Sequence, residues 1–235
     1  LRTEGKRVFV VHSAIAGISN RLEALIAAAI AGQGEDELAA IKAQHIDLAA
    51  ELELDGAAVL APFLAELARL RAGLALTGDA SPRLRARIMA QGELMATSLG
   101  SAWLNLNGVA CQWLDARDLL TSRTASAVSG YLSADCEHGY DAALDQRLRA
   151  GPSGVLLTQG FIARRPDGDT ALLGRGGSDT SAAYFAAKLG AQRLEIWTDV
   201  PGFFSADPRL TGAARQIKAL SYDEAQEIAS MGGSV

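Results

Sequence analysis

The sequence predicts an α/β fold with a mainly parallel sheet and helices on both faces. Short, continuous apolar runs are typical of strands that are buried on both faces of a parallel sheet. Helical patterns alternate with these runs, as in repeated βαβ units, and the N-terminal half adds a long helical insert. With 235 residues, of which 49% are hydrophobic, the chain fits one large globular domain or two small ones and is large enough to bury a core.

The first predicted elements are a strand and a helix joined by a tight loop. Residues 8–11 are β-branched and aromatic, which favours a buried strand. Residues 12–17 form a turn of small residues, and Asn20 is expected to cap an apolar helix that includes residues 22–29. A strand, a loop and a helix in this order begin an α/β unit.

A helical insert follows over residues 36–105. This stretch is rich in Ala and Leu at helical spacing, and Gly56 and Gly73 are interpreted as breaks in it. Ser81 followed by Pro82 predicts the start of the last helix, because proline suits the first helical turn.

The second half alternates between strands and helices. Its predicted elements are strands at 110–114, 155–162 and 194–199, helices at 139–149 and from 179 to about 189, and a turn at 165–168 before the apolar pair 172–173.

Composition excludes several classes of protein. The net charge of −5, from 22 Lys and Arg against 27 Asp and Glu, argues against a general nucleic-acid binder. Cys111 and Cys136 are too few for a disulfide framework, which suits a reducing cytosol. No apolar stretch reaches membrane-spanning length. We therefore expect a soluble, cytoplasmic protein with neither a membrane nor a nucleic-acid partner.

The strongest motif is Gly-Arg-Gly-Gly-Ser-Asp at residues 174–179, between a predicted strand and a helix. Glycines let the backbone approach a ligand closely, and amide groups at a helix start favour anions. Arg175 offers a planar fork for a carboxylate or phosphate. The alternative is a glycine-rich turn in which Ser178 or Asp179 only caps the helix.

A second motif, residues 197–209, begins at the carboxyl end of a predicted strand. Open α/β sheets bind ligands at that edge. A nucleotide fits the motif, with an aromatic face for the base, Asp199 for polar contacts and Arg209 for phosphate. The alternative is a turn with core aromatic residues in which Arg209 pairs with Asp207.

Two smaller features depend on their surroundings. Ser13 and the pair Ser19-Asn20 either contact a ligand or cap a helix. Glu93, in an apolar helical stretch, is either exposed or buried with a cationic partner. The sequence contains no Walker A, GxGxxG, GxSxG or HExxH motif, and its three histidines have no metal-ligand spacing. We therefore expect no protein-bound metal site.

Five segments in order resemble the aspartate kinases of the amino acid kinase family: residues 13–20, 91–96, 158–162, 173–179 and 197–209. The resemblance covers nearly the whole chain. It implies a three-layer α/β/α sandwich and ATP-dependent phosphorylation of the L-aspartate side chain to 4-phospho-L-aspartate, the first step toward lysine, threonine and methionine. It also implies Mg²⁺ with the nucleotide and a homodimer in the full-length protein.

The resemblance also implies the site residues. Within a single domain over residues 1–235, it gives residues 1–150 mainly to aspartate and residues 151–235 mainly to the nucleotide. Ser19 matches a residue that touches aspartate, Glu93 the acid that meets its ammonium, and Arg175 the arginine that clamps a carboxylate. The full set is Ser13, Ser19, Glu93, Arg175 and Ser178 for the substrate, Gly176, Gly177, Thr198, Asp199, Phe204 and Arg209 for the nucleotide, and Asp179 as the catalytic residue that organises the phosphoryl site.

The sequence also departs from the family. No Lys-Phe-Gly-Gly strand precedes Val8, Ser234 stands where the family has a nucleotide-side lysine, and no regulatory ACT modules follow. The expectation is a truncated kinase domain, cut at both ends, with little or no turnover alone. Alternatives are a different acceptor, such as acetylglutamate or glutamate, and a regulatory paralogue that does not catalyse.

Overall fold

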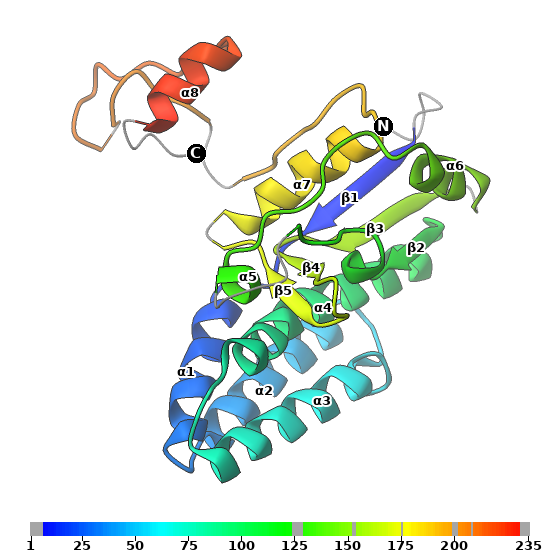
Figure 1. The fold of residues 1–235 in the computed structure, drawn as a ribbon, viewed down its shortest axis with the longest axis vertical. Coiled ribbons are helices and arrows are strands. Elements are labelled where there is room, and N and C mark those ends of the chain that lie inside the picture. The colour runs from blue at the N-terminus through cyan, green and yellow to red at the C-terminus, as the bar shows by residue number, and fades with distance from the viewer. Residues whose placement is uncertain are drawn as a thin grey trace. The chain divides into compact units, whose positions relative to one another are not determined.

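The computed structural model describes residues 7–123, 129–151, 154–174, 176–198, 202–207 and 209–230. The chain divides into two compact units, Leu1–Leu194 and Glu195–Val235. The first unit contains the sheet and seven described α-helices, α1 to α7, drawn from blue to yellow in Figure 1. Its helices are α1 (Ile18–Ile30), α2 (Glu35–Glu51), α3 (Gly56–Thr77), α4 (Pro82–Leu106), α5 (Ser129–Leu132), α6 (Ala142–Ala150) and α7 (Gly177–Lys188), with a 3₁₀ turn, η2 (Ala116–Asp118).

The predicted parallel sheet is confirmed. It consists of β1 (Val8–His12), β3 (Val155–Gln159) and β2 (Cys111–Leu114), in the order β1-β3-β2, and both pairings are parallel. The central strand β3 is buried along its whole length. Its continuous apolar run therefore reflects its position between two neighbours and two layers of helices.

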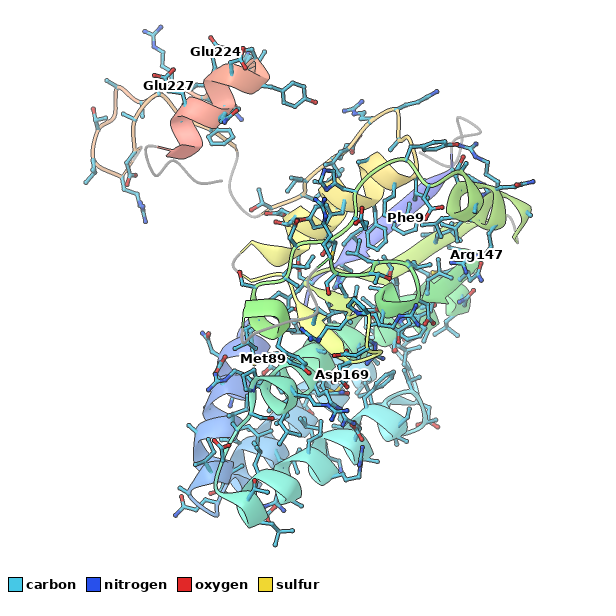
Figure 2. The ribbon with its side chains drawn as sticks, viewed as in Figure 1. Phe9, Met89, Arg147, Asp169, Glu224 and Glu227 are labelled. Atoms are coloured by element: carbon cyan, nitrogen blue, oxygen red, sulfur yellow. The ribbon has the colours of Figure 1, made fainter. Side chains whose placement is uncertain are left out.

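Helices cover both faces of this sheet. Phe9 on β1 packs against Phe185 of α7, with ring centroids 5.0 Å apart (Figure 2). Phe9 is in register with Leu156, so the next residue, Leu157, points to the opposite face. There the Leu157 side chain reaches Gly100 of α4, with Cδ2 3.5 Å from where a Cβ would stand. The α7, sheet and α4 layers form the α/β/α arrangement.

The helical insert is confirmed, with one correction to it and one to the helix before it. Ser81 Oγ accepts a hydrogen bond from Leu84 N at 3.3 Å, and Pro82 begins α4. However, Gly73 lies inside α3 and does not break it, because the packed apolar face of that helix outweighs the cost of one glycine. Asn20 does not cap α1, which begins two residues earlier at Ile18 behind Gly17, whose φ is +80°.

The predicted strand over 155–162 is interrupted. Gly160 and Phe161 separate β3 from β4 (Ile162–Arg164), which pairs antiparallel with β5 (Thr170–Leu172). Phe161 has φ +65°, a left-handed conformation that ends the extended run. Arg83 of α4 donates to Asp169 Oδ1 at 2.9 Å and ties the hairpin to this helix (Figure 2).

The second unit contains α8 (Tyr222–Ser230) and an isolated bridge between Phe204 and Gln216. The predicted strand at 194–199 is wrong in its described part, residues 194–198, which belong to no strand. Ile196 and Trp197 are 52% and 86% exposed. An apolar run becomes a strand only when a neighbouring strand pairs with its backbone, and the described residues offer this run none.

The hydrophobic core belongs to the first unit. Within the described ranges, every buried hydrophobic residue lies between Ile18 and Phe185. The longest buried stretch is in α4, where all residues from 88 to 97 are buried. No helix among the described residues is long and apolar enough to cross a membrane.

Candidate active site

The carboxyl ends of β1 and β3 form the edge at which the predicted site residues gather. Gly160, just after β3, donates its N–H to the carbonyl of His12, the last residue of β1, at 2.9 Å. Ser13 follows His12 and is exposed. Parallel sheets present ligand sites at this edge, because loops and helix starts converge there.

The start of α7 touches the same edge. A Cβ on Gly160 would lie 2.6 Å from Ser178 Oγ and 2.7 Å from its Cα, so only glycine allows this approach. A Cβ on Gly177 would lie 2.6 Å from Phe161 Cδ2. Phe161 N donates to Ser181 Oγ at 2.8 Å. Two glycines therefore bring Ser178 against the end of β3.

The capping interpretation of the glycine-rich loop is wrong. The residue that precedes α7 is Gly176, with φ +66°, and no side chain among the described residues caps the helix. Ser178 and Asp179 lie in the first turn, and Asp179 is exposed. The helix start combines an uncapped N-terminus with glycine backbone, an arrangement that suits an anionic ligand.

Glu93 reaches this edge from α4. It is only 4% exposed, and its Oε2 has no hydrogen-bond partner among the described residues. Burial raises the pKa of Glu93 to about 7, and hydrogen bonds from the backbone N–H groups of Glu93 and Ala14 lower it only in part. The sequence alternatives were an exposed acid or a buried ion pair. The carboxyl group is buried, and the described residues offer Oε2 no cation.

Gly92 explains how α4 comes so close to the loop after β1. A Cβ at this position would lie 3.0 Å from Ala14 Cβ and 3.2 Å from Ile18 Cγ2. The loop is also held by Gln44, whose Nε2 donates to Ala16 O at 3.1 Å. Glycine at position 92 thus lets the neighbouring carboxyl group of Glu93 lie beside Ala14.

The remaining predicted residues lie elsewhere in the described chain or outside the described ranges, and the structure does not place them at this edge. Ser19 is exposed in the first turn of α1. Thr198, Phe204 and Arg209 belong to the second unit. There Arg209 Nη2 pairs with Asp207 Oδ2 at 3.0 Å, the pairing foreseen as the alternative to a phosphate contact. Arg175, Asp199 and Ser234 lie outside the described residues.

Sequence reasoning missed two buried polar residues next to the site, Thr97 and Gln159. Both are 0% exposed, and Gln159 Nε2 donates to Thr97 Oγ1 at 2.8 Å. A polar residue at the end of a buried apolar strand was the available signal for Gln159. No pattern distinguished Thr97 from other helical residues.

Cavity size does not identify the site. One cavity of about 380 Å³ is lined by Trp113, Asp118 and Arg147 among others, and a second of about 300 Å³ by Phe63, Arg87 and Arg117 among others. Neither is lined by a predicted site residue. In the second, Arg87 and Arg117 already pair with Glu66 and Asp115. The candidate site is therefore located by the predicted residues that gather at the sheet edge, and not by these cavities.

Metal binding by the protein alone has no support in the described residues. They contain no group of three or more His, Cys, Asp or Glu side chains that could hold a metal ion.

Known proteins match both the sequence and the fold. The chain is 35% identical over 231 residues to lysine-sensitive aspartokinase 3 of Escherichia coli, covering 96% of this chain and 50% of that protein. It is 33% identical over 230 residues to an aspartokinase of Chlamydia muridarum, covering 98% and 50%. The crystal structure of E. coli aspartokinase III in complex with aspartate and ADP (R-state) matches with a TM-score of 0.82 and 34% identity, covering 95% of this chain and 49% of that one.

The chain thus spans about half the length of the curated relatives it matches. The sequence profile of the amino acid kinase family matches residues 1–235. With the parallel sheet between helices and the glycine-rich start of α7, these matches establish that the chain belongs to the amino acid kinase family.

Proposed function

We propose that this chain is part of an aspartate kinase, which transfers the γ-phosphoryl group of ATP to the side-chain carboxylate of L-aspartate. The observation that carries the proposal is the buried Glu93 carboxyl group, with Oε2 unpartnered among the described residues, which lies against Ala14 in the loop after β1. The end of β3, the strand that pairs with β1, packs against the glycine-rich start of α7. Related proteins are named aspartokinases, and one solved relative contains aspartate and ADP.

The substrate's charges fit these residues. Aspartate carries one ammonium and two carboxylates, so a selective site needs one acid and several cationic or hydroxyl donors. In this proposal Glu93 accepts the ammonium, Arg175 clamps a carboxylate, and Ser13, Ser19 and Ser178 supply hydroxyl groups. A buried, ionised Glu93 without a partner is energetically unfavourable, and a bound ammonium group would supply that partner. Burial of Glu93 therefore favours a cationic ligand over a neutral one.

The nucleotide is assigned to the glycine-rich loop and the second motif. We assign Gly176, Gly177, Thr198, Asp199, Phe204 and Arg209 to ATP, and Asp179 to the organisation of the phosphoryl site. Mg²⁺ enters with ATP as part of the substrate. Catalysis then depends on alignment and on neutralising charge on the transferred group, with no covalent enzyme intermediate.

Several finer points belong to the same proposal. They are the division into an aspartate-side part (1–150) and a nucleotide-side part (151–235), a cytoplasmic homodimer, and a place at the start of lysine, threonine and methionine biosynthesis. Low turnover by the isolated chain also stays a prediction.

The test is a substrate panel with ATP and Mg²⁺. L-Aspartate, L-glutamate and N-acetyl-L-glutamate are offered to the 235-residue chain and to the longer protein from which it comes. ADP release is measured together with hydroxylamine trapping of the acyl phosphate. Only L-aspartate should give both signals. Trapping with another acceptor would reassign the substrate, and aspartate binding without turnover in the longer protein would favour the regulatory alternative.

Two variants separate a substrate role from a general effect of charge. We expect Glu93→Gln to weaken aspartate binding by roughly 10- to 100-fold, as for the loss of a charge-assisted contact, with nucleotide binding little changed. Glu51→Gln, an exposed position on α2, is the matched control and should change neither. Equal losses for both ligands in Glu93→Gln would contradict its assignment.

A further inference from the structure

Thr97 is the centre of a buried hydrogen-bond network one helical turn from Glu93. Its Oγ1 donates to the Glu93 carbonyl at 2.8 Å and accepts from Trp113 Nε1 at 2.9 Å and Gln159 Nε2 at 2.8 Å. A hydroxyl group has one donor and two acceptor positions, so these three bonds use its full capacity.

Gln159 continues the network to the edge of the sheet. It is the last residue of β3, and its Oε1 accepts from Ala116 N of η2 at 2.8 Å. The next residue, Gly160, is the one whose Cα lies against Ser178. Thr97 and Gln159 thus connect the turn of α4 that carries Glu93 with the strand end that meets α7.

Stability alone does not require these polar groups. Apolar residues of the same shape could replace a hydrogen-bonded buried pair at little cost, whereas directional bonds with every partner satisfied fix one geometry. That matters here because Glu93 and Ser178 come from separate elements, and a displacement of about 1 Å can cost about 100-fold in a reaction that depends on alignment.

We propose that Thr97 and Gln159 are positioning residues for the acceptor site. They hold the turn of α4 that carries Glu93 in a fixed position relative to the end of β3, against which Ser178 of α7 packs. This inference rests on the proposed function, since that function gives Glu93 and Ser178 a common substrate. Neither positioning residue needs to touch the substrate.

The first experiment measures aspartate and AMP-PNP affinities by calorimetry on the 235-residue chain and the longer protein. Thr97→Val keeps the shape and removes the hydroxyl group, and Thr97→Ser restores it. We expect Thr97→Val to weaken aspartate binding by about 10-fold or more and Thr97→Ser to stay within about threefold, with AMP-PNP affinity unchanged. Thr77→Val, which removes an exposed hydroxyl bonded to Gly73 O within α3, is the matched control.

A mutant cycle shows whether Thr97 acts through Glu93. In a Glu93→Gln background, Thr97→Val should cause little further loss of aspartate affinity, because the group that it positions has already been changed. The same loss in both backgrounds, or parallel losses for aspartate and AMP-PNP, would overturn the inference and make Thr97 a general structural residue.

A second measurement does not depend on aspartate binding. The carboxyl ¹³C resonance of Glu93, identified by its loss in Glu93→Gln, should titrate near the pKa of about 7 in the parent protein. Thr97→Val leaves the Trp113 and Gln159 donors without an acceptor, and water drawn to them should lower the pKa of Glu93. Thr97→Ser should not.

The two proposals fail in different ways. If the parent protein binds no aspartate but the Glu93 titration moves in Thr97→Val alone, the proposed function fails, and with it the acceptor site, whereas the coupling between Thr97 and the Glu93 turn stands. If aspartate binds, and Thr97→Val changes neither the aspartate affinity nor the titration of Glu93, the positioning role fails. Should Thr97→Val not fold, Thr97→Val combined with Trp113→Phe removes one orphaned donor and allows the same measurements.

Discussion

At the scale of single residues, the burial of Glu93 bears on the stability of the chain and on the ligand binding that we propose. Burial raises the pKa of Glu93 from 4.5 to about 7, which corresponds to roughly 3 kcal/mol when the group is ionised. A carboxyl group that is buried without a charge partner is costly in the free protein, and a ligand cation can offset that cost. Perturbed acids of this kind are typical of functional sites.

This property predicts a pH-dependent difference between the parent protein and Glu93→Gln. Because the folded-state pKa is raised, the contribution of Glu93 to stability is fully present below about pH 4.5 and is lost as the pH rises through about 7. We expect Glu93→Gln to be up to about 3 kcal/mol more stable than the parent at pH 8, with little of that advantage left at pH 4.5. Urea unfolding at both pH values measures the difference, and a pH-independent difference would contradict it.

Gly160 gives a steric prediction at the same scale. Alanine there would place Cβ 2.7 Å from Ser178 Cα, a backbone atom that cannot move alone. We expect Gly160→Ala to lower the free energy of unfolding by about 1–3 kcal/mol and to displace the start of α7.

The control for Gly160→Ala is Gly139→Ala. A Cβ at Gly139 would meet nothing within 4 Å, so this change should be close to neutral in the same denaturation experiment. Equal effects of the two changes would mean that the contact between Gly160 and Ser178 is not tight in solution.

At the scale of elements, glycines inside helices behave according to their neighbours. Gly73 lies within α3 and a Cβ there would meet nothing within 4 Å, so Gly73→Ala should stabilise the protein by about 0.5–1 kcal/mol, or about 1–4 °C in Tm. A Cβ on Gly56, at the start of the same helix, would lie 2.6 Å from Ala49 Cβ. Gly56→Ala should therefore destabilise, and thermal unfolding of both variants checks the contrast.

The local sequence pattern correctly predicted elements that pack within the parallel sheet and the helices around it. The run at Val155 and the Ser81-Pro82 helix start formed as expected, because burial and capping are encoded by adjacent residues. The strand expected at Leu194 did not form, since pairing depends on a neighbour that its own sequence does not specify.

The site was predictable in part for the same reason. Motif resemblance indicated Glu93 and Ser178, and the fold brings both to the edge formed by β1 and β3. The hydrogen-bond network around Thr97 could not be predicted, because its donors Trp113 and Gln159 are 16 and 62 residues away in the sequence.

At the scale of the whole molecule, the two units differ in how much apolar surface they bury. The buried hydrophobic residues that the structure describes all precede residue 194, whereas Trp197, Leu210 and Tyr222 are at least 85% exposed. The first unit therefore holds the hydrophobic core that stabilises the chain.

We expect a chain that ends at residue 194 to unfold with the same free energy as the 235-residue chain, within about 1 kcal/mol, because it loses no described core residue. Urea denaturation of both chains measures this. Iodide quenching of Trp197, with Trp197→Phe to isolate its signal, checks that this side chain is exposed. A large loss of stability together with a shielded Trp197 would contradict the expectation.

The fully buried stretch of α4 also affects how such a protein can change over generations. From residue 88 to residue 97, close to three turns of helix have no side facing water, and Glu93 lies in the middle. A replacement there must match its neighbours in volume and polarity on every side at once. Saturation mutagenesis should find few tolerated substitutions in this stretch and many after residue 194, so new acceptor preferences should evolve more readily through surrounding loops than through this helix.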